Sequence, residues 1–481
     1  MKRLIYCLDG TANEYDDAYP TNVVIMDKSI SENDNGIKQI KYYHEGVGTD
    51  TWESILGGAF GYGLFDNVID SYKHLCEHYE QGDEIYIFGF SRGAFTARSF
   101  AGLIGYCGVL SFENLSELNT VKKYYKDRLT TNKDKIEKFN KWRMENSKLV
   151  CANDEDYTYR RGHLDNQEVI PAILKIKYIG IWDTVKTLGF IKKYDWHDAN
   201  LSSHVEYARH AIALDERREK FNVTKWDNVN ELNRLANKKG KKGTPYQQLW
   251  FPGTHGSVGG GGVHRGLSDE AFQWIREGAK EAGLKFIDNG DAEIFSLKPN
   301  ALDWIYNSTG ENDTWNKQAK SLFLKVVYKA TGTIDREGPL SLDELHQTVK
   351  IRFLAKEKYL PENKLYRPES LSILEEELSN IDEIYEESDY EIALYNRDNI
   401  ESKEESTIVN INNEEFYIYI VKQRDNLSTI SQLITGKASN FKKIQEANEV
   451  SIPDENKIYI GQRIFIPIEL VLKSIIENMT I

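Results

Sequence analysis

Residues 89–93 place the strongest constraint on the fold of this 481-residue chain. They read Gly-Phe-Ser-Arg-Gly, follow an apolar run at 84–88, and precede a helix-like stretch at 94–101. A Gly-X-Ser-X-Gly sequence between a strand and a helix is typical of a sharp turn that lifts the serine hydroxyl clear of the sheet. The two glycines leave room for the strand and the helix to pass closely. The motif predicts that Ser91 is a nucleophile and that a base and an acid follow later in the chain.

The composition fits a folded globular protein and disfavours a nucleic-acid partner. Hydrophobic residues make up 40% of the chain and aromatic residues 12%, while the net charge is −14. A negative chain repels the phosphate backbone. Most of the acidity lies at 375–405, where 13 acidic residues face only Arg397 and Lys403. The charge therefore belongs to one segment.

Four scattered cysteines without CxxC spacing suggest a reducing compartment and no disulfide framework. The first residues, MKRLIYCLDG, reach Asp9 after too few apolar positions for a signal peptide. No apolar run approaches the roughly 20 residues that span a bilayer. We expect a protein that is cytoplasmic in the producing cell and leaves it by a route other than a signal peptide. No His, Cys and Asp cluster has metal-ligand spacing, so neither a metal nor a cofactor is expected.

Strands and helices alternate in the first part of the chain, which predicts a doubly wound, mostly parallel α/β sheet with helices on both faces. The predicted strands are 3–8, 37–43, 84–88, 175–182 and 246–251, and the clearest helix is 64–79.

Four parts follow along the sequence. An α/β-hydrolase-like domain is expected over 1–370, with a helical insertion near 112–170 that is rich in Lys, Glu, Asp and Asn. An acidic linker at 371–415 leads to a small βααβ domain at 416–468. A short apolar tail at 469–481 is expected to pack on its neighbour.

Polar residues directly follow two of the predicted strands. Asp183 comes after the strand at 175–182, and His255 comes after the strand at 246–251. Open α/β sheets build their sites at the carboxyl ends of strands, and α/β-hydrolases carry the order nucleophile, acid, histidine. In such a triad His255 takes the proton of Ser91, and Asp183 holds the imidazole tautomer and stabilises its cation.

An oxyanion hole is expected beside the serine. The backbone N–H of Arg92 would supply one donor, and the turn after the first strand, at Gly10 or Thr11, would supply a second.

Several alternatives remain open from the residues alone. Asp183 can instead cap the turn after its strand, and Asp215, which lies among paired charges, is a second candidate for the triad acid. His210 and His264 compete with His255 for the role of base. A helix-like run at 208–211 favours a structural role for His210.

The set of motifs resembles one family, the α/β-hydrolases that include the first class of type VI secretion lipase effectors. The segments that carry the resemblance are 7–11, 46–49, 89–98, 182–185, 213–217 and 250–255. The resemblance covers about residues 1–290 and implies a phospholipase whose triad falls on Ser91, Asp183 and His255. One departure is the run Gly-Ser-Val-Gly-Gly-Gly at 256–261, where the family has Ser-Asp-Val-Gly-Gly-Gly. Ser257 stands where the family has that aspartate.

Residues 417–467 resemble a LysM domain. The matching parts are 419–430 for the first strand and helix, 444–448 for the second helix and its Asn, and 459–467 for the closing strand. The resemblance implies binding of N-acetylglucosamine glycans such as peptidoglycan, or docking to a phage-tail-like assembly.

These observations together predict a serine hydrolase that deacylates glycerophospholipids at a membrane surface, as an antibacterial type VI effector. A secretion spike protein and an immunity protein are the implied protein partners. The alternatives are a soluble esterase acting on a non-lipid acyl ester and a non-catalytic cargo or structural protein of an injection machine.

Overall fold

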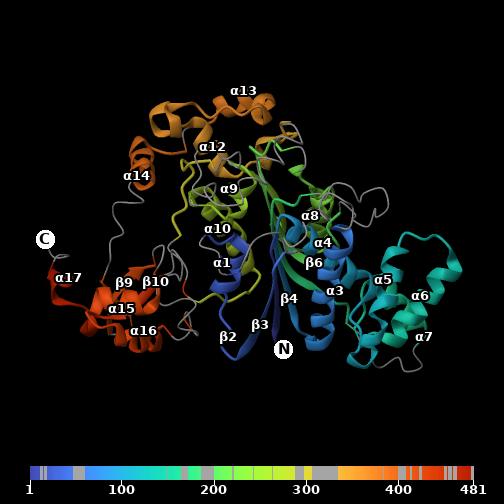
Figure 1. The fold of residues 1–481 in the computed structure, drawn as a ribbon. Helices are drawn as coiled ribbons and strands as arrows, with labels where there is room; N and C mark the ends of the chain where they lie inside the picture. Colours follow the sequence, from blue (N-terminus) through green and yellow to red (C-terminus); the bar gives the residue numbers. More distant parts are fainter. Residues whose placement is uncertain are drawn as a thin grey trace.

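The computed structural model describes most of the chain (Figure 1). The described residues are 1–10, 15, 19–46, 60–148, 150–163, 172–185, 200–218, 221–241, 243–262, 264–287, 297–305, 334–382, 384–398, 408–411, 414–421, 425–448, 452, 458 and 463–477. Thr11 and residues 47–49, which belong to the motifs quoted above, lie outside them. Among the helices described, none is long and apolar enough to cross a membrane.

A seven-stranded sheet forms the centre of the molecule, in the order β2-β3-β1-β4-β5-β6-β7. The strands are β1 (Arg3–Leu8), β2 (Asn33–Asp34), β3 (Ile37–His44), β4 (Glu84–Phe90), β5 (Ile176–Trp182), β6 (Val205–Ala213) and β7 (Tyr246–Phe251). Every pairing is parallel except that of the short β2 with β3. The predicted mostly parallel α/β sheet is therefore confirmed.

The helical reading of 208–211 is wrong, because these residues lie in β6. A central parallel strand is buried on both faces and so lacks the alternating pattern of an exposed strand. The run reads Ala-Arg-His-Ala, and its two polar residues hide the apolar pattern of a buried strand. In the structure Arg209 and His210 are nonetheless buried in β6.

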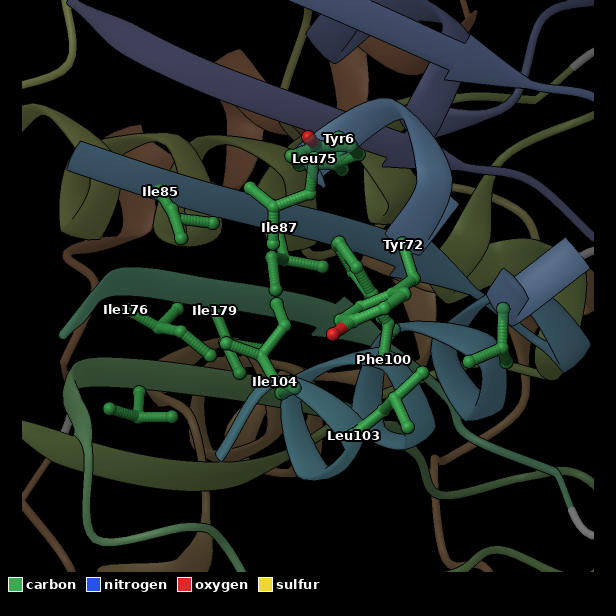
Figure 2. Packing of buried hydrophobic residues seen from close by; sticks show 14 of the residues in the cluster. Tyr6, Tyr72, Leu75, Ile85, Ile87, Phe100, Leu103, Ile104, Ile176 and Ile179 are labelled. Carbon is green, nitrogen blue, oxygen red and sulfur yellow. The ribbon is translucent and has the colours of Figure 1, made fainter. Parts of the chain in front are cut away.

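Helices cover both faces of the sheet, because alternate side chains of each strand point to opposite sides. Leu4 and Tyr6 of β1 join a core with α3 (Phe60–His78), α4 (Arg92–Cys107) and α8 (Val229–Lys238). Ile5 and Cys7 join the opposite core with α1 (Asn22–Ser29) and α10 (Gly266–Glu281). Figure 2 shows the first core, in which Tyr72 and Phe100 of the helices pack over the isoleucines of the strands.

Helices fill the described part of the insertion predicted at 112–170. They are η1 (Phe112–Glu117), α5 (Leu118–Lys126), α6 (Lys133–Asn146) and α7 (Asp154–His163), and they extend to one side of the sheet in Figure 1. The fully buried carboxylate of Asp156 joins α6 to α7, because it lies 3.0 Å from both Arg143 Nε and Arg160 Nε.

A third hydrophobic core lies at the carboxyl ends of β6 and β7. We call the described residues at 297–305 and 334–398, which contribute to this core, the cap. Its helices α12 (Gln347–Leu354) and α13 (Glu375–Ser379) lie above the sheet in Figure 1. The remaining elements of the cap are η4 (Leu342–Glu344), η5 (Glu357–Tyr359), η6 (Pro361–Asn363), η7 (Glu369–Leu374) and α14 (Glu387–Asp398).

The acidic segment at 371–415 is thus not only a linker. Helices α13 and α14 lie within it, and Leu374, Leu378 and Tyr390 are buried in the third core. Its described acidic residues at 375–382 and 386–391 are exposed and lie around these apolar anchors.

The C-terminal unit has its own sheet and its own core. Its elements are β8 (Ile408–Ile411), β9 (Glu414–Ile420), α15 (Leu427–Thr435), η8 (Ala438–Asn440), α16 (Phe441–Ala447), β10 (Arg463–Pro467), η9 (Ile468–Leu470) and α17 (Lys473–Glu477). Buried Asn448 joins the second helix to the last strand: its Nδ2 donates to Ile444 O and to Phe465 O at 2.6 Å, and its Oδ1 accepts from Phe465 N at 2.9 Å. From the tail, Ile475 and Ile476 pack on this core.

Close packing of β1 against the start of α4 requires glycine at position 93. A Cβ atom there would lie 2.1 Å from Leu8 O and 2.5 Å from Asp9 O, both backbone atoms. Gly93→Ala should therefore lower the free energy of unfolding by about 1–3 kcal/mol or more. Gly162→Ala is the control, because a Cβ on this α7 residue meets nothing within 4 Å; we expect it to be neutral or stabilising by up to about 1 kcal/mol. Urea unfolding followed by near-UV circular dichroism measures both, and equal midpoints would contradict the packing argument.

Candidate active site

Ser91 occupies a strained turn between β4 and α4. Its φ of 58° and ψ of −121° are unusual for a residue with a side chain. Such strain persists only where the surroundings fix it, and here the Ser91 amide donates to Trp182 O of the neighbouring β5 at 3.0 Å. The Ser91 side chain does not cap α4. This is the turn that the Gly-X-Ser-X-Gly sequence predicts.

Asp183 directly follows β5, next to Ser91 at the same edge of the sheet. Its carboxylate is fully buried, and its backbone has a positive φ of 37°. Oδ2 lies 2.6 Å from His255 Nδ1, and Oδ1 accepts the Ala213 amide at 3.0 Å. The structure thus brings together Asp183 and His255, two of the three predicted triad residues, in direct contact.

His255 begins the short helix α9 (His255–Gly259), directly after the Pro-Gly-Thr turn that ends β7. Its ring lies between two aromatic rings, with centroids 4.6 Å from Phe90 and 4.9 Å from Phe221. Its backbone N–H donates to buried Glu216 at 3.2 Å. Burial lowers the pKa of the imidazole below its ordinary value, and the hydrogen bond and charge of Asp183 oppose that shift.

Ser91 and His255 share Phe90 as a neighbour. Phe90 precedes Ser91 in the chain and contacts the imidazole, and its ring also fills the space where a Cβ of Gly259 would lie. Gly259 therefore lets α9 approach the serine turn. No hydrogen bond between Ser91 Oγ and His255 is present among the described residues.

Arg336 of the cap is a site residue that the sequence did not reveal. Its guanidinium binds both oxygens of Asp183, with Nη1 to Oδ1 at 2.7 Å and Nη2 to Oδ2 at 2.9 Å. Arg336 is buried, and its charge holds the pKa of Asp183 well below the usual range, against the opposing effect of burial. The two residues are 153 positions apart, and no local pattern around Arg336 marks it.

Two of the three predicted oxyanion donors, Arg92 and Gly10, are among the described residues. Arg92 is the first residue of α4, where the helix dipole favours negative charge. The missing side chain of Gly93 lets the end of β1 come close to this point. The Gly10 amide donates to Asp9 Oδ1 at 2.6 Å, and Thr11 lies outside the described residues.

The competing residues have other contacts. Asp215 accepts the Gly253 amide at 2.5 Å and the Tyr366 hydroxyl at 2.8 Å, and burial raises its pKa. Its carboxylate thus holds the turn before His255 rather than the imidazole. His210 is buried in β6, where its Nε2 accepts from Thr184 N at 3.3 Å and its Nδ1 pairs with Gln248 at 3.0 Å. His264 is exposed.

From the contact between Asp183 and His255 we predict how two substitutions change the pKa of the imidazole. The carboxylate favours the protonated ring, so Asp183→Asn should lower the pKa of His255 further. Asp215→Asn should leave it unchanged, because Asp215 contacts Gly253 and Tyr366 instead. NMR titration of protein labelled with ¹³C in its histidines, assigned with His255→Gln, measures the pKa. A shift caused by Asp215→Asn rather than Asp183→Asn would contradict the assignment.

Comparison with known proteins finds two family models that match parts of this chain. The model of the type VI secretion phospholipase effector Tle1-like catalytic domain matches residues 2–278, and the model of the LysM domain matches residues 419–467. The uncharacterized protein YEL023C of Saccharomyces cerevisiae is 30% identical over 241 residues, which are 46% of this chain and 32% of that protein. This chain therefore matches only about a third of that relative's length.

Two solved structures are also similar. One is an uncharacterized protein from Pseudomonas aeruginosa, with 17% identity and a TM-score of 0.33 over 59% of this chain and 46% of that one. The other is the Tle1 effector bound to the VgrG spike of the type 6 secretion system, with 15% identity and a TM-score of 0.27 over 54% of this chain and 51% of that one. Because the catalytic-domain model covers more than half of the sequence, this chain belongs to the Tle1-like family of type VI secretion phospholipase effectors and carries a C-terminal LysM domain.

Proposed function

We propose that this protein is a serine hydrolase that deacylates membrane glycerophospholipids, with Ser91 as nucleophile, His255 as base and Asp183 as acid. The observation that carries the proposal is the 2.6 Å contact of Asp183 with His255 Nδ1. That contact leaves Nε2 as the ring nitrogen available to a serine, and Ser91 stands in a strained turn hydrogen-bonded to the residue before Asp183. Membership of a phospholipase family supplies the lipid substrate.

The sheet supports an α/β-hydrolase arrangement of these residues. Ser91 follows β4, Asp183 follows β5 and His255 follows β7, in the chain order of α/β-hydrolases. All three strands are parallel members of one sheet, so their carboxyl ends lie at one edge. Residues far apart in sequence can therefore act on one bond.

The chemistry follows from these positions. His255 Nε2 takes the proton of Ser91 as Oγ bonds to the ester carbonyl carbon, whose π electrons move to the carbonyl oxygen. The imidazolium then gives that proton to the departing lysophospholipid oxygen as the carbon–oxygen bond breaks. Water, deprotonated by His255, attacks the acyl-serine; the fatty acid is released and Ser91 regains its proton. Asp183 stays ionised throughout and stabilises the imidazolium.

The negative oxygen of each tetrahedral intermediate needs hydrogen-bond donors. The Arg92 N–H, at the positive end of α4, is the first. The turn after β1 would supply the second. Gly10 and Thr11 are the two predicted donors there, and the Gly10 amide donates to Asp9 Oδ1 at 2.6 Å.

The LysM domain and the family indicate where the enzyme acts. We propose that it is made in the cytoplasm of the producing cell and delivered to a rival bacterium, whose membrane is its substrate. The LysM domain would hold the enzyme on peptidoglycan through N-acetylglucosamine, or dock it to a secretion spike protein. An immunity protein in the producer would be needed to protect its own membrane.

Ser91→Ala should abolish the release of fatty acid from vesicles of phosphatidylethanolamine and phosphatidylglycerol, with a loss of at least about 10⁴-fold in kcat. Ser99→Ala is the matched control on α4; this hydroxyl donates to Phe95 O in the preceding turn, and the change should leave the rate within about twofold. Mass spectrometry of the lipid products measures both and shows which ester is cut.

Other outcomes separate the alternatives. Hydrolysis of soluble acyl esters that depends on Ser91, without activity on vesicles, would make the protein a soluble esterase. A wild-type protein that neither hydrolyses either substrate nor reacts with a fluorophosphonate probe would be a non-catalytic cargo or structural protein.

A further inference from the structure

We infer that Arg336 is a positioning residue through which the cap completes the active site, by fixing the Asp183 carboxylate against His255. This inference rests on the proposed function, in which Asp183 is the triad acid. Arg336 lies beyond residues 2–278, the part of the chain that the family model matches.

The contacts of Arg336 fix the carboxylate in one orientation. A guanidinium that binds both oxygens of a carboxylate holds the two groups coplanar. Nη1 also donates to Ala213 O at 2.7 Å, and Nη2 donates to Phe221 O. Since Ala213 ends β6 and Phe221 packs its ring on His255, the guanidinium joins the acid, the sheet and the wall of the imidazole site.

The segment that carries Arg336 is held on both sides of the arginine, by the loop after β6 and by η7 of the cap. Two residues before Arg336, Ile334 N donates to Arg217 O at 2.8 Å. Two residues after it, a Cβ on Gly338 would lie 1.8 Å from Ser370 O, so the segment packs directly on η7. The loop after β6 and η7 of the cap therefore fix the position of Arg336, far from the serine turn in sequence.

Arg336 also offsets part of the negative charge that the Asp183 carboxylate presents to the imidazole of His255. Oδ2 of Asp183 accepts both from His255 Nδ1 and from Arg336 Nη2, so the two donors share one oxygen. A buried carboxylate without Arg336 would stabilise the imidazolium more strongly. The other charged or titratable groups near this pair are Glu216, which is paired with Arg218, and buried His210.

These contacts set the direction in which the loss of Arg336 should shift the pH dependence of kcat/KM. Because His255 must be neutral to act as a base, its pKa sets the acid limb of kcat/KM. Removing Arg336 raises that pKa, so the acid limb should move to higher pH. Loss of the fixed carboxylate orientation should also lower kcat at every pH, with little change in KM.

The test compares Arg336→Met, Arg336→Lys and Asp335→Asn on phosphatidylethanolamine vesicles across pH. Arg336→Met should lower kcat by about 10–100-fold and raise the apparent pKa of the acid limb by about one unit. Arg336→Lys keeps the charge but not the two parallel hydrogen bonds, so it should restore the pKa more fully than the rate. Asp335→Asn breaks only the exposed pair with Arg217 on the same segment, and its profile should match the wild type.

The inference is overturned if a folded Arg336→Met protein has the wild-type kcat and acid limb while Ser91→Ala is inactive; the proposed function then stands. If Ser91→Ala stays active, the proposed function fails instead, and the NMR titration of His255 in Arg336→Met still tests the contact. If Arg336→Met does not fold, Arg336→Lys decides: a lower kcat with an acid limb near that of the wild type supports the role, and a wild-type kcat contradicts it.

Discussion

The structure of the candidate site depends on one buried carboxylate. Asp183 is completely enclosed, and an ionised carboxylate in such a place is costly unless hydrogen bonds and an opposite charge compensate it. His255, Arg336 and the Ala213 amide supply that compensation from α9, the cap and β6. Each of these elements is therefore tied to the same two oxygen atoms, and the position of the imidazole follows from them.

The three hydrophobic cores explain how α9, the cap and β6 come together at the Asp183 carboxylate. The sheet is buried on both faces, which aligns the carboxyl ends of β4 to β7 at one edge. The third core then seals the ends of β6 and β7 through Ile212, Leu214 and Trp250. A cap attached in this way brings an arginine into the site without belonging to the sheet. The LysM domain has a separate core.

Much of this arrangement could be predicted from the sequence, because it has local signals. The two glycines near Ser91 predict its turn. Asp183 and His255 each follow a strand with a clear apolar pattern. The sequence favoured Asp183 as the triad acid but left Asp215, which lies two residues beyond β6, as a second candidate. Side-chain direction decides between them, and that direction depends on tertiary contacts such as the hydroxyl of Tyr366 on Asp215. Arg336 had no signal because its role depends entirely on the packing of the cap. The strand β6 was misread because Arg209 and His210, which are buried in it, interrupt the apolar pattern that marks the neighbouring strands.

The central claim is that Ser91 and His255 act as one unit, and a crystal structure of the protein after reaction with a lipid-like phosphonate tests it most directly. The account predicts phosphorus bonded to Ser91 Oγ, His255 Nε2 within about 2.6–3.2 Å of an oxygen of the adduct, and the Arg92 amide pointing at the phosphonyl oxygen. A phosphonate that does not react with Ser91, or an adduct with the imidazole out of reach while still bound to Asp183, would contradict it.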